Sequence, residues 1–131
     1  TTRATEFRQQ NFRFRSRNAS SAKELLFASF GDQNGLCYHI GTNYGKQKIW
    51  YNPCKTKKVV ITMSSPTDRY TKPFQVVGRA FSSTSYTTGN PAWCSIDLGA
   101  ESRLICNYYT FRSDGSSHFL INWSFQGSLD G

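Results

Sequence analysis

Short apolar runs separated by turn-forming residues recur along most of this 131-residue chain, and their spacing constrains the fold more than any other feature. Val59–Met63 is rich in β-branched residues, and in Trp93–Leu98 apolar and polar side chains alternate with a period of two. Gly99 interrupts the pattern before a second apolar run, Leu104–Phe111. Since no long helical period is present, the sequence predicts an all-β sandwich or barrel. Trp93–Leu98 and Leu104–Phe111 are expected to be two buried strands joined by a tight turn.

Three further segments are assigned by the same reasoning. Leu36–Ile40 and Phe119–Phe125 are expected to be strands because each is a short apolar run bounded by turn residues. Two alternatives stay open for residues 22–30. Ser21 and Glu24 have the spacing of a capping box that would start one or two helical turns, whereas Leu25 to Phe30 can equally form a strand.

The net charge of +8 is concentrated in two segments. Residues 46–58 contain five lysines and no acid, and residues 1–23 carry a net charge of +5. We therefore expect residues 1–23 to form a basic arm that attracts nucleic acid or an acidic partner. Its key side chains are Arg8, Arg13, Arg15 and Arg17. Within it, Phe12–Arg15 alternates ring and charge, so this segment is expected either to pair as a strand or to remain an extended tail.

The cysteines and the missing motifs bear on redox state, metal binding and catalysis. The four cysteines form no C-x-x-C pair, and Cys94 and Cys106 lie in strand patterns, so we expect reduced thiols in the cytoplasm. Cys37, His39 and Cys54 lack a fourth ligand at any standard zinc spacing, so no metal or cofactor is expected. The sequence contains no nucleophile elbow, phosphate-binding loop, zinc-protease or dinucleotide motif, which predicts a non-catalytic protein. No apolar run approaches the ~20 residues of a membrane-spanning helix. Since Pro66–Thr71 also has no Leu, Phe or Met at its tip, no membrane binding is expected.

Several blocks, taken in order, resemble the discoidin, or coagulation-factor C-type, domain. They are Val59–Ser65, Gly78-Arg79, Trp93–Gly99, Tyr108–Phe111 and Asn122–Gly131. Two earlier blocks, Asn34–Asn43 and Trp50–Pro53, resemble the intracellular branch found beside BTB and HECT regions in ubiquitin-ligase-type proteins. The resemblance covers about residues 25–131. It implies a galactose-binding-like jelly-roll β-sandwich over residues 24–131, preceded by the basic arm of residues 1–23.

The resemblance also implies an incomplete sandwich. In that family the Ser-x-Asp-Gly turn is followed by about three more strands, whereas this sequence stops at Gly131. A sandwich without those strands would have an open edge. The expected solutions are strands in a segment that follows, strands added by another chain, or partial filling by Phe12–Arg15.

Discoidin-like domains bind ligands through loops at one end of the sandwich, and the resemblance places those loops at Pro66–Thr71, Ser82–Asn90 and Ser113–His118. An arginine beside a tyrosine suits recognition of a carboxylate, a phosphate or a sugar ring. The candidate ligand-binding residues in and beside these loops are Asp68, Arg69, Tyr70, Tyr86, Arg112, Asp114 and His118.

Two functions remain from the sequence. The first is a non-catalytic interaction module that binds a protein or a carbohydrate through these loops and acts as an adaptor in a ubiquitin-ligase-type protein. The second is a structural subunit of a large complex, whose basic arm contacts nucleic acid or an acidic partner.

Overall fold

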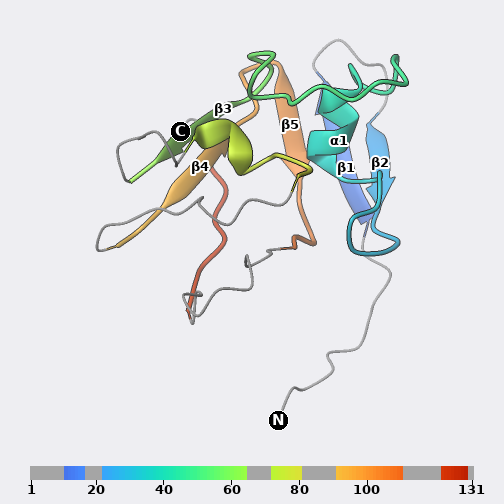
Figure 1. Ribbon diagram of the computed structural model, residues 1–131. Coiled ribbons are helices and arrows are strands. Elements are labelled where there is room, and N and C mark those ends of the chain that lie inside the picture. Colours follow the sequence, from blue (N-terminus) through green and yellow to red (C-terminus); the bar gives the residue numbers. More distant parts are fainter. Residues whose placement is uncertain (1–10, 17–21, 65–71, 81–90, 111–121, 130–131) are drawn as a thin grey trace. The chain divides into compact units, whose positions relative to one another are not determined.

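A computed structural model describes residues 11–16, 22–64, 72–80, 91–110 and 122–129 (Figure 1). The chain forms two compact units: Thr1–Tyr51 with Leu98–Thr110, and Asn52–Asp97 with Phe111–Gly131. Over the described ranges, the regular structure consists of five strands, one six-residue α-helix and one three-residue 3-10 helix. The expected β-rich character is confirmed, and the jelly-roll arrangement stays a prediction.

The first unit contains a three-stranded antiparallel sheet. Its strands are β1 (Asn11–Ser16), β2 (Lys23–Leu26) and β5 (Ser102–Ile105), in the order β2-β1-β5. Phe12 lies opposite Leu25, and Phe14 lies opposite Leu104, so β1 is the central strand. The strand alternative for residues 12–15 is therefore the observed one.

The helical alternative for residues 22–30 is wrong, because Lys23–Leu26 is a strand. The capping-box spacing of Ser21 and Glu24 is a local signal worth about 1 kcal/mol. Pairing with β1 and burial of Leu25, which is 6 % exposed, outweigh it.

The expected strand at Leu36–Ile40 is also wrong, since Leu36–Gly41 is helix α1. The helix begins after Gly35, whose backbone is extended, and the amide of Thr42 closes it by donating to the carbonyl of Tyr38 at 3.0 Å. Ile40 is 1 % exposed and belongs to the core of this unit. A short apolar run fits a buried helix as well as a strand, and here packing decides between them.

In the second unit β3 (Val60–Met63) and β4 (Cys94–Asp97) form a two-stranded antiparallel sheet, and the 3-10 helix η1 covers Pro73–Gln75. The expected strand at 59–63 is confirmed. Its core contains Val59, Ile61 and Val77, all less than 10 % exposed. The side-chain amide of Asn52 donates to the carbonyl of Phe74 at 2.8 Å, and the Lys55 ammonium lies 4.1 Å from the centre of the Phe74 ring. These contacts tie the segment with the lysines to η1.

The predicted pair of buried strands needs correction. β4 confirms the strand in 93–98, and Gly99 forms the expected turn with φ of +79°. However, β4 pairs with β3 and β5 pairs with β1, and all four residues of β4 are exposed. Alternation identifies a strand but carries no information on its partner.

The expected strand at Phe119–Phe125 is not present in its described part, residues 122–125. Trp123 is 56 % exposed and Phe125 is 54 % exposed. Residues 119–121 lie outside the described ranges.

Candidate functional site

The ligand-binding residues expected from the sequence lie outside the described part of the chain. This holds for Asp68, Arg69, Tyr70, Tyr86, Arg112, Asp114 and His118, and likewise for Arg8 and Arg17 of the basic arm. Arg13 and Arg15 are backbone members of β1. The loop site and the basic arm therefore stay predictions, and the described residues offer two other places where function can be sought.

The first place is the outer edge of β4. Ser64 N–H donates to the carbonyl of Trp93 at 2.9 Å, and this marks a hydrogen-bonded pair of the β3–β4 ladder. Such pairs alternate along an antiparallel ladder, so Ser95 and Asp97 direct their backbone groups toward β3. Cys94 and Ile96 then direct their N–H and C=O groups to the opposite edge. No strand within the described ranges pairs with that edge.

The two faces of this sheet differ. Residues that lie opposite each other share a face, so Ile61 and Ile96 lie on one face and Thr62 and Ser95 lie on the other. The polar face is joined by a hydrogen bond of 2.6 Å between the hydroxyls of Thr62 and Ser95. On the apolar face Ile61 is 5 % exposed, whereas Ile96 is 44 % exposed. The apolar face is therefore covered over β3 and open over β4, beside the unpaired edge.

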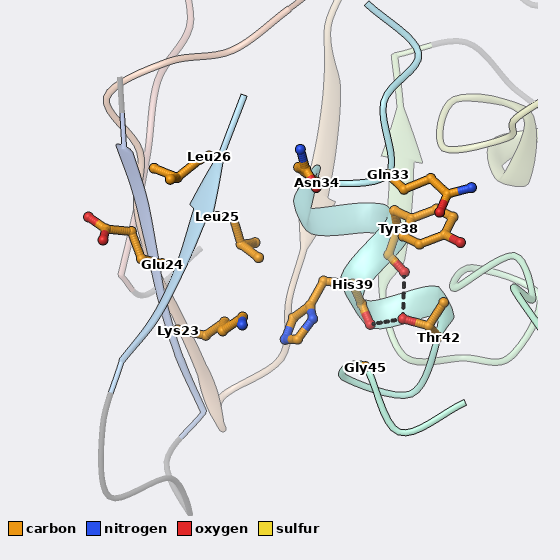
Figure 2. A pocket seen from close by; sticks show the side chains of 10 residues that line it. All are labelled: Lys23, Glu24, Leu25, Leu26, Gln33, Asn34, Tyr38, His39, Thr42 and Gly45. Carbon is orange, nitrogen blue, oxygen red and sulfur yellow. Dashed lines mark hydrogen bonds between the residues drawn. The ribbon is translucent and has the colours of Figure 1, made fainter. Parts of the chain in front are cut away.

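The second place is a hollow of about 430 Å³ between β2 and α1 in the first unit (Figure 2). Lys23 and His39 line it and point toward each other, whereas Glu24 points to the other side of β2. This division follows from the strand, in which successive side chains alternate between faces. The side-chain amides of Gln33 and Asn34 lie at the rim.

His39 is held by the turn that ends α1. The hydroxyl of Thr42 donates to the carbonyl of His39 at 3.0 Å. The imidazole meets the ring of Tyr44 edge-on, with 5.9 Å between centroids. Gly45 has φ of +80°, and a Cβ there would lie 3.7 Å from His39 Cε1. The chain therefore passes close to the ring without filling the hollow.

Electrostatics in the hollow favours a neutral imidazole. Burial lowers the pKa of His39, and the positive charge of Lys23 lowers it further. Asp32, just before the rim, accepts hydrogen bonds from the amides of Ala28 at 2.8 Å and Asn34 at 2.9 Å. Burial raises the pKa of Asp32, but these backbone hydrogen bonds outweigh burial and the net pKa is lowered. The Asp32 carboxylate thus holds the loop that carries Asn34 in place through these hydrogen bonds.

All four cysteines are free thiols. Burial raises the pKa of Cys37 to about 11 and also raises the pKa of Cys94 and Cys106. Such thiols react slowly because little thiolate is present at neutral pH. Within the described ranges no group of three His, Cys, Asp or Glu residues could hold a metal ion. The same ranges contain no helix that is long and apolar enough to span a membrane.

The sequence singled out His39 as a conceivable zinc ligand and placed Lys23 at the end of the basic arm. Neither residue has a local signal that joins it to the other, because strand pairing and helix packing bring them together. Ile96 was assigned correctly to a strand, but its exposure depends on which strand pairs with β4. The exposure of this β4 edge among the described strands therefore follows from the tertiary structure alone.

Comparison with known proteins places this chain beside segments of larger proteins. It is 46 % identical over 125 residues to a BTB/POZ domain-containing protein of Arabidopsis thaliana. It is 34 % identical over 111 residues to the E3 ubiquitin-protein ligase hecd-1 of Caenorhabditis elegans. The alignments cover 91 % and 82 % of this chain, but only 15 % and 4 % of those two proteins.

No family model matches the chain, and no solved structure matches it. The expected relationship to BTB-containing and ubiquitin-ligase proteins is confirmed as sequence similarity. Membership of the discoidin family stays a prediction.

Proposed function

We propose that this chain is a non-catalytic protein-interaction module of larger cytoplasmic proteins connected with ubiquitin transfer. One observation carries the proposal: similar segments occur in a BTB/POZ domain-containing protein and in an E3 ubiquitin-protein ligase, as small fractions of each. A segment that recurs within otherwise different proteins behaves as a separable unit. Binding is the function that such a unit can most simply bring to each of them.

We place the protein-binding surface at the outer edge of β4. Cys94 and Ile96 offer backbone donors and acceptors there, and an extended segment of a partner protein adds to such an edge as a further strand. Ile96 is 44 % exposed and Trp93 is 50 % exposed beside it. Covering the exposed part of Ile96 would contribute roughly 1 kcal/mol, in addition to the new backbone hydrogen bonds.

The test is affinity capture of partners with one disruptive and one matched variant. Ile96→Lys places a charge on the open apolar face, next to the unpaired edge. Val60→Lys introduces the same side chain on the opposite face of the same ladder, where Val60 is 56 % exposed. We expect Ile96→Lys to lose a defined set of partners that includes ubiquitin-transfer proteins, and Val60→Lys to retain them.

Three outcomes would count against this proposal or a part of it. If both lysine variants capture the same partners as the unmodified chain, the β4 edge is not the binding surface. If Arg69→Ala with Tyr70→Ala abolishes capture instead, the predicted loops bind the partner. A captured set without any protein of ubiquitin transfer would remove the functional context while leaving the surface assignment intact.

Carbohydrate is an alternative ligand for the predicted loops, and nucleic acid is an alternative ligand for the basic arm. The same capture experiment tests both alternatives. Free sugar would release partners that are held through carbohydrate, and nuclease treatment would release partners that are held through nucleic acid. Deleting residues 1–22 would be a poor test of the arm, because it would remove β1, the central strand of its sheet. Arg8→Ala with Arg17→Ala tests the charge without deleting that strand.

A further inference from the structure

We propose that the hollow between β2 and α1 binds a single carboxylate of an acidic peptide, with the Lys23 ammonium and the His39 imidazole as its ligands. This site lies in the first unit and is independent of the β4 edge, which lies in the second.

The charge distribution is the first argument. Lys23 and His39 face each other across the hollow, and within the described ranges the Lys23 ammonium makes no ion pair or hydrogen bond. Among the described residues that line the hollow, Glu24 is the only one with a carboxylate, and it points to the other side of β2. A lysine directed into a concave surface opposite an imidazole attracts an anion, because the walls exclude part of the screening water.

The space beside His39 is the second argument. Gly45 approaches the ring without a side chain, so the hollow of about 430 Å³ stays open next to the imidazole. Asp32 accepts the side-chain amide of Asn34 at 3.4 Å, which fixes one side of the rim. A carboxylate in this frame would lie between the Lys23 ammonium and the His39 imidazole.

The number of charges favours a carboxylate over a phosphate. One ammonium and one imidazole match a single negative charge, whereas phosphate sites commonly use arginine forks or several backbone N–H groups. Glu24 at the margin would further disfavour a dianion. Phosphate binding is therefore an outcome that the test must separate.

Binding of an anion must couple to protonation of His39. The positive charge of Lys23 lowers the pKa of His39, and a bound carboxylate opposes that charge, so it raises the pKa. By linkage, the carboxylate binds more tightly as pH falls and His39 becomes protonated. The other titratable groups that border the hollow or the ring, on the described elements, are Glu24, Tyr38 and Tyr44.

The experiment is an NMR pH titration of His39. The chain contains two histidines, so His118→Gln leaves His39 as the single reporter. The probe is glutamate blocked at both its amino and α-carboxyl groups, and the matched control is blocked glutamine, which has the same shape without the charge. We expect blocked glutamate, and not blocked glutamine, to raise the pKa of His39.

Two lysine variants complete the test. Lys23→Met should raise the pKa of His39 without any ligand and weaken binding of blocked glutamate about fivefold, the effect of losing a partly exposed charge pair. Lys48→Met removes an exposed lysine of the same unit that does not line the hollow, and it should change neither quantity. Unchanged backbone NMR spectra verify that both variants fold.

The proposal is overturned if blocked glutamate leaves the pKa of His39 unchanged, or if the Lys23→Met variant binds it as well as the unmodified chain. Inorganic phosphate is titrated in parallel. If phosphate binds more tightly than blocked glutamate, the site is an anion site of another kind and the carboxylate assignment is wrong.

Discussion

Among the glycines of the described ranges, Gly41 has the least room for a side chain, so Gly41→Ala is the sharpest test of how α1 packs. Gly41 is buried at the end of the helix, and its carbonyl accepts the amide of Tyr51 at 2.9 Å. A Cβ at this position would lie 2.5 Å from Trp50 Cδ1 and 2.6 Å from the carbonyl oxygen of Tyr51. Both distances are below 3.0 Å, so an atom of Trp50 or Tyr51 must move to admit the Cβ.

The expected change in the free energy of unfolding for Gly41→Ala follows from two opposing effects. Forcing an additional methyl group into a packed site costs about 1–3 kcal/mol. Replacing glycine by alanine in a helix stabilises the folded state by roughly 1 kcal/mol. One obstacle is a backbone carbonyl, and the other is a ring whose Nε1 donates to the carbonyl of Cys37 at 3.4 Å, so neither moves easily. We therefore expect the upper end of the cost and a net loss of about 2 kcal/mol.

The assay is urea unfolding followed by tryptophan fluorescence and far-UV circular dichroism. With a typical urea dependence of about 2 kcal/mol/M, the midpoint should fall by roughly 1 M. Gly127→Ala is the matched control, because no heavy atom lies within 4 Å of its added Cβ. That variant should unfold at the original midpoint or slightly above it. A midpoint for Gly41→Ala equal to or above the original would refute the packing of Trp50 against α1.

Three further predictions concern single interactions. Asp32→Ala should cost roughly 1 kcal/mol at pH 7 by leaving backbone amides unpaired. Because folding lowers the pKa of Asp32, this stabilisation is complete above the ordinary value of 3.8 and is lost as pH falls below it, so urea unfolding near pH 3 should show a smaller difference. Cys37, with its pKa raised from 9.0 to about 11, should react with iodoacetamide at pH 8 about 100-fold more slowly than an unperturbed thiol, as measured by mass spectrometry. A double-mutant cycle with Thr62→Val and Ser95→Ala should give a coupling of about 0.5 kcal/mol from their hydroxyl contact of 2.6 Å.

Each of these has a result that contradicts it. A stability difference for Asp32→Ala that grows on acidification would reverse the sign derived for its carboxylate. Native Cys37 that reacts as fast as it does in concentrated urea would show that burial does not protect it. Additive effects of Thr62→Val and Ser95→Ala would mean that the two hydroxyls do not interact across the β3–β4 ladder.

The sequence predicted local structure best where residue type and alternation agree. β3 and β4 were found because β-branched residues and a period of two both favour strands, and Gly99 was found because a turn with positive φ favours glycine. It failed at α1, where the apolar run of Leu36–Ile40 has no period long enough to separate helix from strand. The hollow could not be predicted at all, since Lys23 and His39 carry no shared motif.

The sequence by itself determined the β-rich composition, the free thiols and the similarity to segments of BTB and ubiquitin-ligase proteins. These depend on side-chain type and short-range order, which a linear pattern records. Only the tertiary structure decided that residue 13 pairs with residue 105, that no strand of the described ranges pairs with the outer edge of β4, and that Lys23 faces His39. These depend on non-local pairing, in which many partners satisfy the same alternating pattern and the packing of the whole unit selects one.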